Sequence, residues 1–203
     1  MPIFKNISPW DKHRIKWKGC QACSLCKNRL HIVLARGQIP CDVLFVGEAP
    51  GASEDVIGQP FVGPAGRLLD QIVERGINDA RPIDPATRLR SAFTNIVCCL
   101  PTNESIPGKL PEPPVESIKA CAPRLAELVA MCRPRLIVTV GKLSDRWTPI
   151  ATQKLDLGEL KIKPPKWASI IHPAAILRML PAQQGLAVQR AVVTLEDAVA
   201  DLK

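Results

Sequence analysis

Three polar residues stand beside apolar, strand-like runs of the sequence and could do chemistry together. Glu48 follows the run 43–46, Asn95 lies near the start of a second run, and His172 directly follows a third. Ligands of open α/β sheets bind where the carboxyl ends of parallel strands meet. Each residue alone could be structural, but a carboxylate, an amide and an imidazole next to three different strands favour one shared polar pocket.

The stretch 42–70 is expected to build much of this pocket, because its apolar strand breaks into a glycine-rich loop and a helical pattern follows. The loop has neither the Gly-Lys-Ser/Thr ending of a P-loop nor the Gly-x-Gly-x-x-Gly of a dinucleotide turn. It carries acidic residues beside Phe61, which suits a site for a planar, polarisable group. The alternative is a solvated loop whose acidic residues, Glu48, Glu54 and Asp55, only cap the following helix.

The cysteines indicate a metal site. Cys20 and Cys23 form a Cys-x-x-Cys pair, which brings two thiolates to one metal or cluster with little strain in the chain. A redox-active pair is the rival interpretation, but that motif normally lies between a strand and a helix, which is not its context here. Cys41 is expected to be a small buried side chain. Two further ligands must come from elsewhere, and the candidates are Cys98, Cys99, Cys121 and Cys132.

The hydrophobic pattern predicts an α/β fold in which four buried strands alternate with helices. The strands are expected at 43–46, 93–98, 136–140 and 168–171. Helices are expected from Pro64 to a stop at Gly76, over 115–131, from about 142, and over 183–202. The helix 115–131 would turn Cys121 inwards. We expect the whole chain, 1–203, to form a single domain.

The chain is basic, with 27 Lys and Arg against 19 Asp and Glu, a net charge of +8 and a pI of about 9.2. An anionic partner is therefore expected, and nucleic acid is the usual one. No apolar run reaches the roughly 20 residues of a membrane span, and the N-terminus lacks the apolar core of a secretory signal. We therefore expect a cytoplasmic protein with no membrane partner, whose eight cysteines bind metal or are buried rather than forming disulfides.

Residues 1–19 interleave Trp10 and Trp17 with lysines and arginines. We expect a short helix that packs its tryptophans on the body of the protein. The alternative is that this segment contacts DNA phosphates.

Four motifs, in order along residues 20 to about 180, resemble the uracil-DNA glycosylase superfamily and most closely its family 4, the iron–sulfur enzymes. Each motif alone is moderately specific, whereas all four in this order are highly specific. The motifs are Cys20-x-x-Cys23-x-Leu25 with Arg29; Gly47-Glu-Ala-Pro-Gly51 with Glu54-Asp55 and Gly58-x-Pro-Phe-Val-Gly63; Thr94-Asn95-x-Val-x-Cys99; and His172-Pro-x-x-x-Leu-Arg178.

The resemblance implies a three-layer sandwich, with a central, mainly parallel four-stranded sheet between helices. It also implies a structural [4Fe–4S] cluster, for which the N-terminal segment 1–30 supplies the first two ligands. Cys99 is preferred to Cys98 because it stands at the family's distance after the asparagine, and replacement by Cys98 stays open. The implied ligands are Cys20, Cys23, Cys99 and Cys121.

The activity that the resemblance implies is hydrolysis of the N-glycosidic bond of uracil in DNA, after the nucleotide has been flipped out of the helix. By resemblance, Phe61 stacks on the base and Asn95 reads its edge, while His172 hydrogen-bonds the departing base. Glu48 is the candidate to position water and stabilise the cationic sugar. The remaining implied roles are pocket closure by Ala49 and Glu54, insertion into the vacated stack by Ile176, and phosphate binding by Arg178.

One departure from the family concerns the loop after Cys99, where Asn103-Glu104 replaces an expected Asn-Arg pair and stands one residue early. The loop is also longer than is usual in the family, so the alternative is a glycosylase for a different modified pyrimidine, such as one in foreign DNA. A non-catalytic DNA- or uracil-binding module is the other alternative, although such a module would need no water-positioning acid. We expect a monomer that acts on single- or double-stranded DNA.

Overall fold

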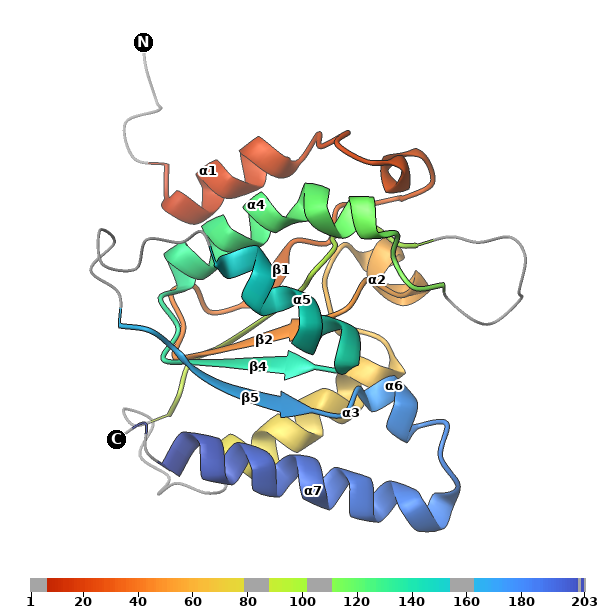
Figure 1. Cartoon of the computed structure of the whole chain (residues 1–203), viewed down its shortest axis with the longest axis vertical. Helices are drawn as coiled ribbons and strands as arrows, with labels where there is room; N and C mark the ends of the chain where they lie inside the picture. Colours follow the sequence, from red (N-terminus) through yellow and green to blue (C-terminus); the bar gives the residue numbers. More distant parts are fainter. Residues whose placement is uncertain (1–6, 79–87, 102–110, 154–162, 201, 203) are drawn as a thin grey trace.

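The computed structural model of the chain describes residues 7–78, 88–101, 111–153, 163–200 and 202 (Figure 1). Its strands are β1 (Ala35–Gly37), β2 (Val43–Gly47), β3 (Ser91–Asn95), β4 (Leu136–Val140) and β5 (Lys166–Ile170). Its α-helices are α1 (Pro9–Trp17), α2 (Ala52–Ile57), α3 (Pro64–Val73), α4 (Val115–Cys132), α5 (Lys142–Thr152), α6 (Pro173–Ile176) and α7 (Pro181–Ala200), with a 3₁₀ turn at Ser24–Lys27 and a π-helical turn at Glu74–Asn78.

The described strands form one sheet in the order β1-β3-β2-β4-β5, in which β2 to β5 are parallel and β1 is antiparallel to β3. The α/β fold with a mainly parallel central sheet is therefore confirmed, but the sheet has a fifth strand. This extra strand, Ala35-Arg36-Gly37, is short and lacks an apolar run, so hydrophobic periodicity could not reveal it.

Helices cover both faces of the sheet, with α3 and α7 on one side and α1, α4 and α5 on the other (Figure 1). Alternate side chains of β2 point to opposite faces, as strand geometry requires. Val43 and Phe45 join the core beneath α3 and α7, while Leu44 and Val46 join the core beneath α4 and α5. Because both faces are covered, all five β2 residues are buried, and the strand reads as a continuous apolar run.

The chain does not end its third helix at Gly76 as predicted. The helix α3 ends at Val73 and continues directly into the π-helical turn that contains Gly76. A Cβ atom on Gly76 would lie 2.8 Å from the Cβ of Leu195 in α7. The glycine therefore permits close packing of two helices rather than a helix stop.

Parallel strands bring the carboxyl ends of β2, β3, β4 and β5 to one edge of the sheet, beside the short helices α2 and α6 (Figure 1). We call this edge the rim. None of the helices in the described part of the chain is long and apolar enough to cross a membrane.

Candidate functional site

The rim is organised around Gly47, the last residue of β2. A Cβ atom on Gly47 would lie 2.4 Å from the Oδ1 of Asn95 and 2.4 Å from the Cζ of Phe61. The amide of Asn95, at the end of β3, and the ring of Phe61, after α2, therefore flank the same backbone position. Any side chain at 47 would occupy the space between them, which explains why glycine is found there.

Asn95 presents a polar group that lacks a partner. The residue is 2% exposed, and its Nδ2 has no hydrogen-bond acceptor among the described residues. A buried amide donor without a partner costs about 1–3 kcal/mol, and such exceptions in folded proteins call for an explanation. A ligand that brings a carbonyl oxygen into the rim would satisfy this donor.

Phe61 adopts a left-handed backbone conformation, with φ of 56°. This conformation costs a residue with a side chain about 1–2 kcal/mol, so its surroundings must hold it there. The backbone of Gly66 in α3 packs directly against Phe61, because a Cβ atom on Gly66 would lie 1.9 Å from the carbonyl oxygen of Phe61. The ring meets Phe93 of β3 edge-to-face at 6.1 Å.

His172 caps the amino end of α6. Its Nδ1 accepts a hydrogen bond of 3.1 Å from the backbone N–H of Ala174. This contact requires an unprotonated Nδ1, so the proton of the neutral ring sits on Nε2. Burial lowers the pKa of His172, the positive charge of Arg178 lowers it further, and the nearby Glu54 opposes both. The site therefore holds a neutral imidazole that can donate from Nε2.

Glu48 follows β2 directly and is half-buried at the rim. Burial raises the pKa of its carboxyl group, and the charge of Glu112 adds to this rise, while Arg178 opposes it. The charge of Arg178 thus acts on both Glu48 and His172, although these two residues are 124 positions apart in the sequence.

Glu54 links two loops of the protein through hydrogen bonds to their backbone. Its Oε2 accepts from the backbone N–H of Gly51, and its Oε1 accepts from that of Gly63, each at 3.0 Å. This carboxylate therefore fixes the chain on both sides of α2. Ala49 is half-buried and packs against the core beneath α4 and α5.

Asp55 has a related structural role that the sequence left open. The residue is 3% exposed, and its carboxylate accepts hydrogen bonds from the backbone N–H groups of Leu30 and His31. The acid therefore ties residues 30–31 to α2 instead of capping the helix that contains it.

The placement of Ile176 disagrees with its predicted insertion into DNA. Its side chain is 0% exposed and belongs to the core beneath α3 and α7. The neighbouring Leu177 is 43% exposed, because the short helix α6 turns position 176 inwards and position 177 outwards. Arg178 is exposed, so a contact with phosphate is open to it.

Four cysteines from distant segments gather beside the core beneath α4 and α5. Burial raises the pKa of Cys99 to about 11, and the nearby thiols of Cys121 and Cys23 add to the rise. Cys20 and Cys121 are likewise close enough to act on Cys98. The donor set that the resemblance implied is therefore brought together, with Cys98 as an additional neighbour.

Arg29 supports the choice of Cys99 as a ligand. Its guanidinium donates to the Sγ of Cys99 at 3.5 Å and to the backbone carbonyl of Cys20 at 2.6 Å, which links the two segments. The same guanidinium offsets part of the rise in the pKa of Cys99 that burial causes. A positive donor aimed at sulfur favours the thiolate form, which is the form that binds iron or zinc.

Among the described residues, no three side chains of ligand type lie close enough to hold one metal ion. A [4Fe–4S] cluster is larger than one ion, and each of its cysteines binds a different iron atom, so its ligands stand farther apart than those of zinc. Cys41 and Cys132 form a separate buried pair at the other end of α4, where they are hydrogen-bonded to each other. Cys41 is buried as expected, at 2% exposure.

The N-terminal helix packs as the sequence predicted. The indole of Trp17 donates to Glu127 of α4 at 2.8 Å, and Trp10 stacks on the buried His13. Burial lowers the pKa of His13 to about 4. The tryptophans and this neutral histidine therefore attach α1 to α4.

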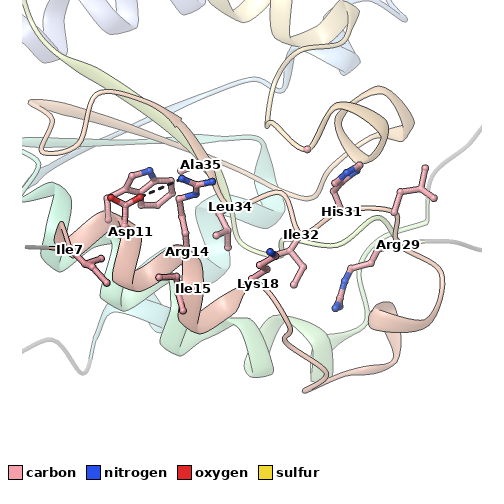
Figure 2. Close-up of a pocket in the computed structure, with 13 residues that line it drawn as sticks. Ile7, Asp11, Arg14, Ile15, Lys18, Arg29, His31, Ile32, Leu34 and Ala35 are labelled. Atoms are coloured by element: carbon pink, nitrogen blue, oxygen red, sulfur yellow. Dashed lines mark hydrogen bonds and ion pairs between the residues drawn. The ribbon is translucent and has the colours of Figure 1, made fainter. Parts of the chain in front are cut away.

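A basic groove of about 880 Å³ runs between α1 and the segment before β1 (Figure 2). Four basic side chains line it, namely Arg14, Lys18, Arg29 and His31, and Asp11 pairs with the first of them. None of the residues around Gly47 lines this groove. It is thus a surface separate from the rim.

Comparison with known proteins agrees with this geometry. The family model of the "Uracil DNA glycosylase superfamily" matches residues 35–195. A "Type-4 uracil-DNA glycosylase" of Pyrobaculum aerophilum is 34% identical over 83% of this chain and 84% of its own length. A protein of the same description from Archaeoglobus fulgidus is 31% identical over 78% of each chain. A third, from Saccharolobus solfataricus, is 35% identical over 62% of this chain and 52% of its own length.

Proposed function

The chain belongs to the uracil-DNA glycosylase superfamily, and we propose that it is a monofunctional DNA glycosylase that hydrolyses the N-glycosidic bond of uracil in DNA. The observation that carries this proposal is the unpartnered amide of Asn95, buried at the rim opposite the ring of Phe61. A flipped uracil would stack on the ring and offer a carbonyl oxygen to Nδ2 of the amide. Both walls flank Gly47 at the carboxyl end of the parallel strand β2, where ligands of such sheets bind.

His172 supplies the leaving-group interaction in this proposal. As the glycosidic bond breaks, electrons move onto the base, and an oxygen of the uracil ring gains negative charge. The Nε2–H of the neutral imidazole donates to that oxygen and stabilises it. Because Nδ1 is held by the Ala174 N–H, the ring keeps one orientation before and during the reaction.

Glu48 acts on the other fragment. The sugar becomes cationic as the base leaves, and a carboxylate beside it stabilises that charge and orients the attacking water. Arg178 opposes the rise in the pKa of Glu48 and so helps to keep the acid ionised. The water then adds to the sugar carbon, which yields free uracil and an abasic site.

Leu177, rather than Ile176, is the side chain that we assign to the gap left by the flipped nucleotide. It is exposed, apolar and only five positions after His172. Arg178, the next residue, would bind a phosphate beside that gap.

We further assign a [4Fe–4S] cluster to Cys20, Cys23, Cys99 and Cys121. The thiol chemistry fits, and Arg29 supplies a positive donor beside Cys99. Bound there, the cluster supplies a structural cross-link between the N-terminal segment and the part of the chain that leads from β3 to α4. The protein residues at the rim carry the reaction themselves.

The preferred base is tested with the purified protein and a panel of oligonucleotides, each carrying one candidate pyrimidine. Abasic sites are then revealed by alkaline cleavage. We expect cleavage at uracil. The departure at Asn103-Glu104 lies outside the described residues, so a modified pyrimidine belongs in the same panel. Cleavage of that base in preference to uracil would reassign the substrate, and tight binding without cleavage would favour the non-catalytic module.

A further inference from the structure

Each wall of the pocket is held from behind by an arginine that no step of the proposed reaction uses. Arg124 of α4 lies behind Asn95, and Arg36 of β1 lies behind Phe61. In the contacts described, neither guanidinium group touches the side chain of Asn95 or of Phe61. Both instead donate hydrogen bonds to backbone carbonyl groups of the residues that flank Gly47.

Arg124 is 1% exposed and is one of the largest fully buried side chains of the protein. Its guanidinium donates to the carbonyl oxygen of Asn95 at 2.5 Å and to that of Ile96 at 3.3 Å. It also donates to the hydroxyl of Thr94 at 2.8 Å, which in turn donates to the carbonyl of Leu34 at 2.7 Å. One side chain therefore fixes three consecutive residues at the end of β3.

The position of Arg124 is costly for the fold, which argues for a specific use. Among the described residues its hydrogen-bond partners are neutral, and its Nε has none. A buried cation without a paired carboxylate is strongly disfavoured unless its surroundings compensate it. An apolar residue at this position would fill the same space between α4 and the sheet without that cost.

Arg36 holds the second wall in a similar way. It donates to the carbonyl of Pro60 at 2.8 Å and to that of Phe61 at 3.3 Å, while Asp70 of α3 pairs with its charge at 2.6 Å. Its guanidinium also lies over the ring of Phe93, 4.0 Å from the centroid. These contacts supply the surroundings that the left-handed backbone of Phe61 needs.

We infer that Arg124 and Arg36 are positioning residues for base recognition, Arg124 acting through Asn95 and Arg36 acting through Phe61. This inference rests on the proposed function, since it concerns how the same pocket recognises its base. A side chain that must meet one edge of a planar base tolerates little displacement, and a misplacement of about 1 Å can cost about 100-fold in rate. The arginines limit that displacement without touching the substrate.

The first test is a double-mutant cycle on single-turnover excision of uracil. Arg124→Met keeps an unbranched, flexible side chain that is shorter than arginine, and it removes the donors and the charge. We expect it to slow excision about tenfold to 100-fold in the wild-type background, but less than about threefold when Asn95 is already alanine, because contacting residues are not additive. Arg36→Met should show the same loss of effect in a Phe61→Ala background. Additive effects in both cycles would overturn the inference.

Two controls separate positioning from stability. Arg90→Met removes an arginine that pairs with Asp42 at the opposite, amino end of the strands, and its effect should add to that of Asn95→Ala. Arg124→Lys keeps the charge and one donor, so it should recover part of the rate. Affinity for DNA that already contains an abasic site should not change in any of these variants, because no base is present for the walls to hold.

The second test does not depend on activity. The N–H of Ile96 donates to Gly47 at 2.9 Å and that of Val97 donates to Glu48 at 3.2 Å, so hydrogen exchange of this segment reports on the wall. In Arg124→Met the segment 93–99 should exchange faster, while α7 and β4 stay protected as in the wild type. Unchanged exchange in 93–99 would overturn the inference, even for a protein that cleaves uracil. Faster exchange of 93–99 in Arg124→Met, together with a wild-type protein that excises no base, would retain the role of Arg124 in holding the wall and remove the proposed function.

Discussion

At the scale of single residues, the pocket depends on a position that carries no side chain. Gly47 separates Phe61 from Asn95, and both are within 2.4 Å of where its Cβ atom would lie. Glycine is thus required by space, since its own φ is not in the left-handed region. This reason can be tested without removing any side chain that takes part in the proposed reaction.

Gly47→Ala should therefore slow single-turnover excision of uracil by about tenfold or more, since the methyl group displaces the walls. It should also destabilise the protein by about 1–3 kcal/mol, because it overfills a packed site. Thermal unfolding and excision rates measure the two effects. Gly185→Ala is the matched control, since a Cβ atom there meets nothing within 4 Å. A Gly47→Ala enzyme with the wild-type rate would place the base elsewhere.

The pH dependence should report Glu48. Its carboxyl group acts in the ionised form, and its pKa is raised by burial. The rate should therefore fall on acidification at a higher pH than for an ordinary glutamate. Glu48→Gln should be slower by about two to three orders of magnitude, and its residual rate should stay flat through the pH range in which the wild-type rate falls. The same acid limb in the variant would assign that limb to another group.

Among the elements of the fold, the short helix α6 determines which apolar side chain of residues 176–177 reaches the surface. The sequence motif predicts insertion by Ile176, which is buried, because a motif does not show which face of a four-residue helix points inwards. Leu177→Ala should weaken excision from double-stranded DNA, where a flipped nucleotide leaves a gap, more than excision from single-stranded DNA. Ile176→Ala should instead lower the unfolding free energy by about 2–5 kcal/mol, as expected for a buried aliphatic residue. Equal loss on both kinds of DNA for Leu177→Ala would contradict the assignment.

The link between the N-terminal segment and α4 depends on the cysteine set. Cys99→Ser should remove iron and visible absorption from the purified protein, whereas Cys26→Ser should keep both. Cys98→Ser should also keep iron and visible absorption, and their loss in this variant would identify Cys98 as the ligand in place of Cys99. Metal analysis that finds zinc and no iron in the wild type would replace the cluster with a zinc site.

The elements that were predicted well are those whose burial is complete. The strands β2 and β4 lie at the centre of the sheet and read as unbroken apolar runs, so β4 was placed at its observed bounds, Leu136–Val140. The edge strand β5 was predicted as 168–171 but runs from Lys166 to Ile170, because its first residues are exposed and give no apolar signal. The edge strand β1 has no apolar run, so the sequence pattern did not predict it.

The two arginines show what sequence patterns miss. Arginine is expected at the surface, so neither was assigned to the pocket. Arg124 nevertheless stands at helical spacing from Cys121 and Leu128, on the side of α4 that faces the sheet. An arginine on the apolar side of a predicted helix therefore indicates a buried, structural arginine. Arg36 offered no comparable signal, since its role depends on a strand that only the three-dimensional structure reveals.

The whole molecule consists of two parts of the chain that are held together in different ways. The sheet and its rim bring together residues from position 47 to position 178, and the family match over 35–195 covers this part. The segment before residue 35 attaches through Asp55, Glu127 and the cysteines instead. Loss of the proposed cluster should therefore loosen the N-terminal segment first, while the rim stays assembled on the sheet.

In the proposed function, the rim breaks a glycosidic bond rather than merely binding a base. The most direct measurement follows free uracil and abasic sites together, in one time course with uracil-containing DNA. We predict that wild-type protein releases one uracil for each abasic site formed, and that His172→Ala slows both by about two to three orders of magnitude with little change in affinity for DNA. Uracil-containing DNA that is bound tightly, with neither product formed, would contradict the account.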